Sequence, residues 1–227
     1  MHWKSCLLLA CLLFGAPFSA ADDAQRPPIG AYALVTEQSI VRIQVFRDGI
    51  LKLAGHNHVI GLRALQGLIL VSDTVAESSL TLEFSTADLT VDLPEDRSHG
   101  GQEFRSPIDE PSRVSTRKNM LGPSLLNAAR YPQIKISSVT LRGTFEQLSV
   151  DALVSLAGMD NIVTIPVTVS YAEGQITARG KFSLRHEQLG LAPFEVLLGA
   201  LAVRDEMLFE FEILARPLEA DQPVNPL

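Results

Sequence analysis

Alternation of apolar and polar residues is the feature of this sequence that most constrains its fold. Valine and isoleucine alternate with mostly polar residues over 41–45, and 80–84 and 150–154 show the same period of two. Successive side chains of a β-strand point to opposite faces, so the pattern predicts strands with one apolar face. Similar runs bring the expected number of strands to about eight or nine; they lie at 64–71, 134–141, 165–171, 175–184 and 206–214.

A sheet built from so many short antiparallel strands has to hide its edges. An eight-stranded up-and-down barrel does this by closing on itself, and it leaves room for one ligand. A β-sandwich is the alternative, because periodicity alone does not separate the two architectures. We expect an all-β protein whose fold is an extended, eight-stranded antiparallel barrel with a short helical insertion between strands.

The insertion is predicted where the alternation stops, between residues 92 and 130. The polar and glycine-rich stretch 94–111 is expected to be a loop. After it, Ser112 is a candidate cap for a helix over 113–121, which Gly122-Pro123 would end. A helix inserted between two strands of a barrel can lie across its open end, so we expect 92–130 to form a lid.

The beginning of the sequence has the form of a secretory signal. Lys4 precedes an apolar run, 6–14, that is too short to span a bilayer, and small residues stand at the expected cleavage site after Ala21. We therefore expect the protein in the periplasm. The predicted organisation is a signal peptide at 1–21, a flexible segment at 22–30, the barrel domain at 31–216 and a disordered tail at 217–227.

Both cysteines, Cys6 and Cys11, lie in the predicted signal peptide. The exported chain would then have no disulfide, thiol nucleophile or thiolate ligand. A lipoprotein signal with Cys11 acylated is the alternative. The net charge of −7 argues against nucleic acid as a partner and against anionic membranes held by charge. No later apolar run is long enough for a membrane span.

The sequence contains none of the common catalytic motifs. It has no Gly-x-Ser-x-Gly elbow, no phosphate-binding glycine loop and no His-Glu-x-x-His. Glu83, Glu210 and Glu212 alternate with apolar residues, as expected on a solvated strand face, and His186-Glu187 is interpreted as surface. We expect a protein that is not an enzyme and has no cofactor apart from a bound lipid.

His56 and His58 are the candidate polar site. Residues i and i+2 of a strand share a face, so the pair could bind a metal, with His99 or His186 as a third ligand. In a second interpretation, these histidines and Asn57 hydrogen-bond the backbone at a bend. In a third, His56 or His58 is the polar group at the end of an apolar tunnel, where it meets a quinone carbonyl or an alcohol.

Several segments resemble the YceI-like family. Asn127-Ala128-Ala129-Arg130-Tyr131-Pro132 matches its Asn-x-Ala/Lys-Tyr-Pro signature, and 154–158 followed by 165–169 resembles its strand, glycine turn and valine-rich strand. The likeness also includes 55–60 and 180–184 and covers about 31–214. The chain departs from the family at Gly158-Met159-Asp160-Asn161-Ile162, which lacks the usual threonine and proline, and in a longer 94–111 loop.

The resemblance implies a lipocalin-like barrel around a polyisoprenoid chain, typically a quinone tail. We therefore predict a periplasmic binding or carrier protein for a long-chain isoprenoid or quinone-like lipid. The predicted ligand contacts are His56 and His58 with the apolar strand faces, namely Val41, Ile43, Val45, Leu80, Leu82, Phe84, Ile134, Ile136, Val150, Phe182, Phe209 and Phe211.

Two alternatives remain at this stage. One is a metal-binding protein or enzyme that uses His56 and His58. The other is a ligand-free interaction module whose 94–111 loop binds a protein and whose barrel is filled. The sequence leaves open the identity of the lipid, the choice between monomer and homodimer, and the role in transport, stress protection or electron transfer.

Overall fold

Strands make up most of the computed structural model, which describes residues 26–218. The predicted signal peptide and nearly all of the predicted tail lie outside this range. The strands are β1 (Gly30–Leu34), β2 (Ile40–Asp48), β3 (His58–Leu62), β4 (Gln66–Val71), β5 (Ser79–Ser85), β6 (Thr90–Val91), β7 (Gln133–Gly143), β8 (Gln147–Leu156), β9 (Met159–Ala172), β10 (Gln175–Arg185), β11 (Glu195–Val196) and β12 (Leu201–Pro217).

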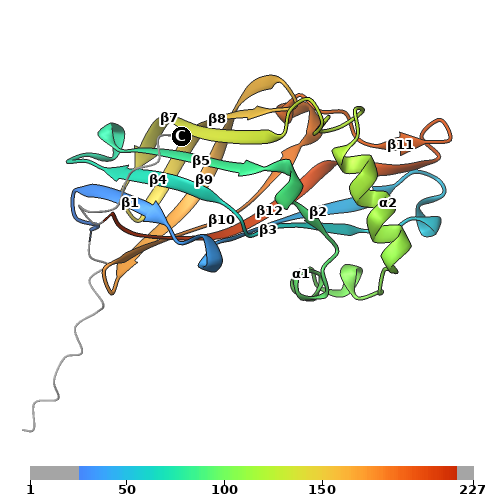
Figure 1. Cartoon of the computed structure of the whole chain (residues 1–227), viewed down its shortest axis with the longest axis horizontal. Helices are drawn as coiled ribbons and strands as arrows, with labels where there is room; N and C mark the ends of the chain where they lie inside the picture. Colours follow the sequence, from blue (N-terminus) through green and yellow to red (C-terminus); the bar gives the residue numbers. More distant parts are fainter. Residues whose placement is uncertain (1–25, 219–227) are drawn as a thin grey trace, which may run out of the picture.

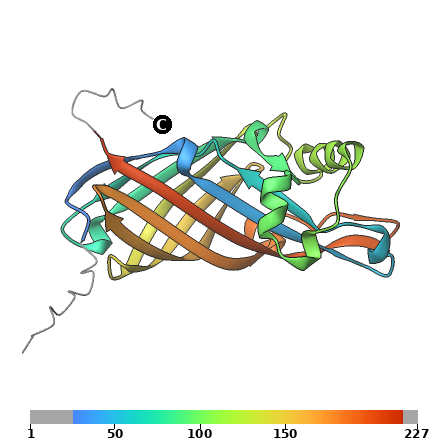
Figure 2. The same ribbon diagram turned by 90° about the horizontal axis from the view of Figure 1, so that it is seen from below.

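The strands close into an antiparallel barrel (Figures 1 and 2). Three pairs of consecutive short strands, β1 with β2, β3 with β4, and β5 with β6, each occupy one position in it. β12 closes the barrel because it pairs with β2 along its first part and with β1 near its end. The barrel therefore has eight long strand positions, which confirms the predicted architecture; the short β11 pairs only with β12.

The alternation of the sequence separates the inside of the barrel from the outside. Phe182 on β10 and Phe209 on β12 are paired in register and stack inside, with ring centroids 5.3 Å apart. On the outer face of the same two strands, Arg179 of β10 pairs with Glu212 of β12 at 2.9 Å. Cross-strand pairs of opposite charge stabilise a sheet only modestly. The pairs on the outer face therefore help to fix the register of the strands more than they stabilise the fold.

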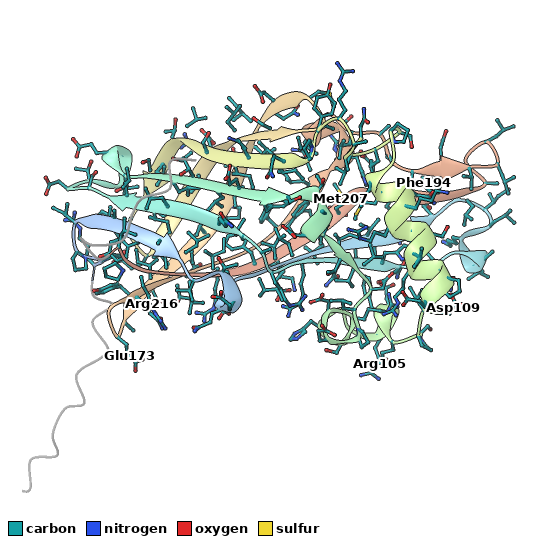
Figure 3. The ribbon with its side chains drawn as sticks, in the orientation of Figure 1. Arg105, Asp109, Glu173, Phe194, Met207 and Arg216 are labelled. Carbon is teal, nitrogen blue, oxygen red and sulfur yellow. The ribbon has the colours of Figure 1, made fainter. Side chains whose placement is uncertain are left out.

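One end of the barrel is filled by side chains. Tyr32, Ile176 and Ala215 form a buried cluster there, against which Tyr171 and Phe145 pack. The rings of Tyr32 and Tyr171 meet edge to face with centroids 6.5 Å apart. Figure 3 labels Glu173 and Arg216 at this end, which we call the plugged end.

Helices α1 (Pro94–His99) and α2 (Glu110–Leu121) lie between β6 and β7 near the opposite end, the lid end (Figure 1). The prediction of a loop over 94–111 was thus wrong in part. Pro94 starts α1, and two acidic residues follow it in the first turn, where they favour a helix N-terminus. No helix within residues 26–218 has the length and apolarity needed to cross a bilayer.

Helix α2 begins earlier than predicted because Asp109, and not Ser112, caps it. The Asp109 carboxylate accepts a hydrogen bond from the Ser112 backbone N–H at 2.8 Å, and Pro111 occupies the first turn. The helix ends at Leu121, before Gly122, as the sequence predicted.

Buried charges hold α1 on the outside of the barrel. The carboxylate of Asp96, with no exposed area, receives Arg42 from β2 at 3.0 Å and Arg63 from the β3–β4 connection at 2.6 Å. Removing one partner from such a pair leaves an uncompensated buried charge. This cluster fixes the beginning of the insertion against the barrel wall.

Arg26 and Leu218, which lie within the two segments predicted to be flexible or disordered, contact the barrel. Arg26 donates to the carbonyl oxygens of Ser72 and Asp73 at 2.7 Å each, and its guanidinium lies over the Phe145 ring. At the other end, the Leu218 N–H donates to the Ala31 carbonyl at 2.8 Å. The described part of both segments is therefore attached.

Candidate functional site

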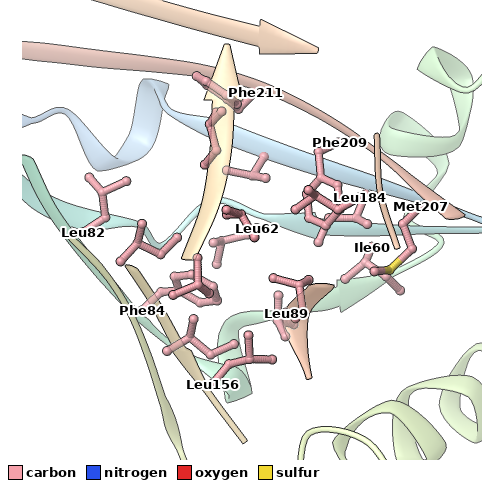
Figure 4. A pocket seen from close by; sticks show the side chains of 18 of the residues that line it. Ile60, Leu62, Leu82, Phe84, Leu89, Leu156, Leu184, Met207, Phe209 and Phe211 are labelled. Carbon is pink, nitrogen blue, oxygen red and sulfur yellow. The ribbon is translucent and has the colours of Figure 1, made fainter. Parts of the chain in front are cut away.

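A cavity of about 360 Å³ occupies the inside of the barrel (Figure 4). The structure places all twelve predicted apolar contact residues on its wall. Phe182, Phe209 and Phe211 point inward and are still only half-buried, because they face the cavity. The filled barrel that a ligand-free interaction module predicts is therefore contradicted.

Small residues keep the cavity open. Gly180 on β10 lies directly opposite Phe211 on β12, and a Cβ at position 180 would collide with the Phe211 ring and with the Pro166 carbonyl oxygen. Ala178 contributes only a methyl group to the same wall. An unfilled apolar cavity lowers the free energy of unfolding by about 24 cal/mol per Å³. An apolar occupant of this cavity should therefore stabilise the folded protein by several kcal/mol.

Polar side chains enter the cavity wall only at the lid end. Within residues 26–218 they are His58, Thr116, Asn119 and His186, and the rest of the wall is apolar or glycine. Thr116 and Asn119 come from α2, whose Met120 is buried against the same space. The cavity is thus amphipathic along its length, with a polar mouth and an apolar interior.

The mouth is covered by α2 with few anchors. Arg117 donates from Nε to the Leu89 carbonyl at 3.2 Å and from Nη2 to the Ala87 carbonyl at 2.7 Å. Met120 is the only buried residue of the helix. An element with so little buried apolar surface opens more easily than the strands, so α2 fits the predicted role of a lid.

His58 is oriented by a buried carboxylate. Its Nδ1 lies 2.6 Å from Oδ2 of Asp92, whose Oδ1 accepts from the Val59 N–H at 2.9 Å and from Arg97 Nη1 at 2.6 Å. Burial raises the pKa of Asp92, but the hydrogen bonds from His58, Val59 and Arg97 outweigh it and hold that pKa below its ordinary range. The carboxylate stays ionised, so His58 donates to it from Nδ1. Nε2 is then the ring nitrogen that remains for contact with a ligand.

His186 was interpreted as a surface residue, and this was wrong. Its side chain is 4 % exposed and lines the cavity. Nδ1 lies 2.8 Å from the backbone carbonyl of Asp205, which can only accept, so Nδ1 carries the proton and a neutral ring presents Nε2 as an acceptor. An irregularity in β12 between Val203 and Met207 brings Asp205 to the ring, and no local pattern in the sequence reveals it.

His56 does not join His58 in the cavity. It precedes β3, is exposed and does not line the cavity, so the expected shared strand face was wrong, although the two rings lie edge to face with centroids 6.3 Å apart. Asn57 between them accepts from the Arg47 N–H at 2.9 Å and donates to the Glu103 carbonyl at 3.3 Å, which fixes the bend. Among residues 26–218, no three His, Cys, Asp or Glu side chains are grouped to hold a metal ion.

Comparison with known proteins agrees with this architecture. The family model of the YceI-like domain matches residues 32–215. BcnA of Burkholderia cenocepacia superposes with a TM-score of 0.59 at 15% identity, over 80% of this chain and 98% of that chain. No curated protein is significantly similar to the chain.

Two further solved structures share the fold. A polyisoprenoid-binding domain from Saccharophagus degradans has a TM-score of 0.55 at 10% identity, over 84% of this chain and all of that chain (100%). A Campylobacter jejuni YceI protein has a TM-score of 0.52 at 11% identity, over 70% of this chain and 85% of that chain.

Proposed function

Since the chain belongs to the YceI-like family, we propose that its barrel binds one long-chain isoprenoid or quinone-like lipid. The tail lies along the apolar interior, and the head group stays at the polar mouth under α2. The observation that carries the proposal is the cavity itself, which is apolar throughout except at the lid end. The similar fold of a polyisoprenoid-binding domain supports it.

Burial of the tail supplies the affinity. Each methylene removed from water contributes about 0.8 kcal/mol, less the cost of ordering the chain. The wall supports binding, because the side chains that face the cavity are apolar apart from two histidines, a threonine and an asparagine. The proposed function is therefore binding and release of the lipid rather than catalysis.

The mouth favours a hydroxyl on the ligand. His186 presents Nε2 as an acceptor when neutral, and the Asp92 hydrogen bond orients His58 in the same sense. An alcohol or a quinol can donate to such a nitrogen, whereas a quinone carbonyl needs a donor. A polyprenol or a reduced quinone is thus the head-group chemistry that fits the two histidines, whereas a quinone carbonyl would have to accept from Thr116 or Asn119.

The proposed setting is the periplasm. The apolar run of 6–14 after Lys4 supports export through a cleaved signal, although this part of the chain lies outside the described residues. There the protein would act as a carrier that keeps a water-insoluble lipid out of solvent between two membranes or two enzymes.

Mass spectrometry of the purified, exported protein tests the proposal. The native spectrum is expected to show one bound lipid per chain, and organic extraction should release a polyprenyl species. Replacement of Phe182 by glutamate places a charge in the wall and is expected to abolish retention. Ser183→Glu is the matched control, because Ser183 is the exposed neighbour on the same strand and faces outward.

A second variant guards against misfolding. Ala178→Phe fills part of the cavity without a charge, so the protein should fold and select a shorter lipid. The proposal is wrong if the exported protein carries no lipid and takes up none on incubation with polyprenol. It is equally wrong if Phe182→Glu retains the lipid at the stoichiometry of Ser183→Glu.

A further inference from the structure

Two loops at the lid end carry a cluster of exposed aliphatic side chains. The β2–β3 loop contributes Ile50 at 89% exposure and Leu53 at 84%, and the β11–β12 turn contributes Leu197 at 69% and Leu198 at 105%. The two loops are joined, since the Leu51 N–H donates to the Ala200 carbonyl at 2.8 Å. We call this cluster the apolar tip; its members are Ile50, Leu51, Leu53, Val196, Leu197 and Leu198.

The backbone of the β11–β12 turn is strained at the two exposed leucines. Leu197 and Leu198 have φ angles of +54° and +56°, and Gly199 follows at +80°. The Ala200 N–H closes the turn by donating to the Leu197 carbonyl at 3.2 Å. Positions with positive φ favour glycine, asparagine or aspartate, and leucine is unfavourable there. Folding therefore gains nothing from these two leucines, either by burial or by conformation.

The tip continues the wall of the cavity. Val45 of β2 lines the cavity five residues before Ile50, and Phe194 lines it immediately before β11. Val203 of β12 lines it on the return from the turn. Figures 1 and 2 both show the two loops projecting past α2 at the same end of the barrel. The tip thus lies just beyond the lid-end wall of the cavity on the same two hairpins, with Arg47 paired to Val203 between them.

We propose that the apolar tip inserts into the surface of a lipid bilayer and places the cavity mouth against it, so that lipid enters and leaves without crossing water. The cargo in this proposal rests on the proposed function; the docking itself does not. The occupant follows from shape and chemistry. The two adjoining turns project from the barrel, and most of their aliphatic side chains are largely exposed. Lipid chains can surround such a convex shape, because a bilayer is fluid.

The composition of the tip favours a membrane over a protein partner. Its apolar members are all aliphatic, whereas the centres of protein interfaces are enriched in tyrosine, tryptophan and arginine. Lys52 lies among them, where its stem can pack on acyl chains while its ammonium group stays at the head groups. The net charge of −7 makes apolar insertion, and not charge, the expected source of affinity.

Vesicle flotation tests the docking. Uncharged vesicles of phosphatidylcholine and phosphatidylethanolamine are mixed with the full, exported protein, and the bound fraction is measured at low and high salt. We expect binding that survives high salt. The double variant Leu197→Asn with Leu198→Asn should weaken partition about tenfold or more, while its thermal midpoint stays the same or rises because asparagine tolerates positive φ.

Ile162→Asn is the matched control, because Ile162 is 62% exposed on β9, outside the tip. It should bind vesicles like the wild type. Docking is overturned if the wild type does not float with the vesicles, or if the tip variant and the control bind equally. Lipid content is measured on the same samples, and the tip variant is expected to lose lipid together with flotation because the cavity loads through the docked mouth. Normal lipid content with lost flotation would overturn this entry route, and absent lipid in a wild type that docks overturns the cargo alone.

Discussion

His58 donates from Nδ1 to Oδ2 of Asp92 at 2.6 Å. This hydrogen bond joins the start of β3 to the residue that follows β6, at the cavity mouth. The other oxygen of the same carboxylate receives Arg97 of α1 at 2.6 Å. One buried carboxylate therefore orients His58, one of the polar side chains of the cavity mouth, and fastens the start of the lid insertion to β3. The chemistry of the mouth and the attachment of the lid depend on the same residue.

Replacement of Asp92 by asparagine should cost about 3 kcal/mol of the free energy of unfolding, because it leaves Arg97 as a buried charge without its partner. Urea denaturation measures the change. Asp151→Asn is the control, since Asp151 binds Arg142 on the solvent side of the barrel and its loss should change the midpoint far less. Equal shifts in both variants would contradict the role assigned to Asp92.

The same carboxylate makes stability depend on acid pH. The pKa of Asp92 in the folded protein lies below its ordinary value of 3.8, so the unfolded chain binds this proton more readily. The stabilisation is fully present well above pH 3.8 and is lost as pH falls through that value to the folded pKa. The difference in stability between wild type and Asp92→Asn should therefore be constant near neutral pH and shrink in acid, as urea midpoints at several pH values would show.

Removal of the Arg117 side chain should open the lid. Its two hydrogen bonds to the Leu89 and Ala87 carbonyls are the side-chain anchors of α2 on the β5–β6 stretch, and each contributes about 1 kcal/mol. Arg117→Ala is expected to release a fluorescent fatty alcohol several-fold faster in stopped-flow exchange. Lys118→Ala, on the exposed side of the same helix, should leave the rate unchanged; an equal acceleration there would assign the effect to helix propensity or charge.

The histidines should set head-group preference. Phytanol and phytane share a branched tail and differ in one hydroxyl, so the ratio of their dissociation constants isolates the mouth. His58→Leu should reduce the preference for phytanol roughly fivefold, the value of about one hydrogen bond. Leu82→Ile, in the apolar part of the wall, should change both affinities together. An unchanged ratio in His58→Leu and His186→Leu would refute the proposed hydrogen bonds.

Much of the barrel could be predicted from the sequence because its signal is local. Inward Phe209 and Phe211 and outward Glu210 and Glu212 follow from the period of two alone, and the structure pairs both glutamates with cations on the outer face. The helix end at Gly122 follows from local chemistry in the same way. The start of α2 was missed because Asp109 and Ser112 are both good caps, and only the fold of the loop before them selects one.

The candidate site, too, was predictable from the sequence only in part. Alternation and the family resemblance determined which side chains face inward, and all twelve predicted apolar contacts lie on one cavity wall. Only the tertiary structure decided that His186 enters the mouth and that His56 stays outside it. An irregularity in β12 and the position where β3 begins set these two outcomes, and both depend on pairing between strands that are distant in the sequence. Side-chain direction is encoded locally, whereas convergence at a mouth is a property of the closed barrel.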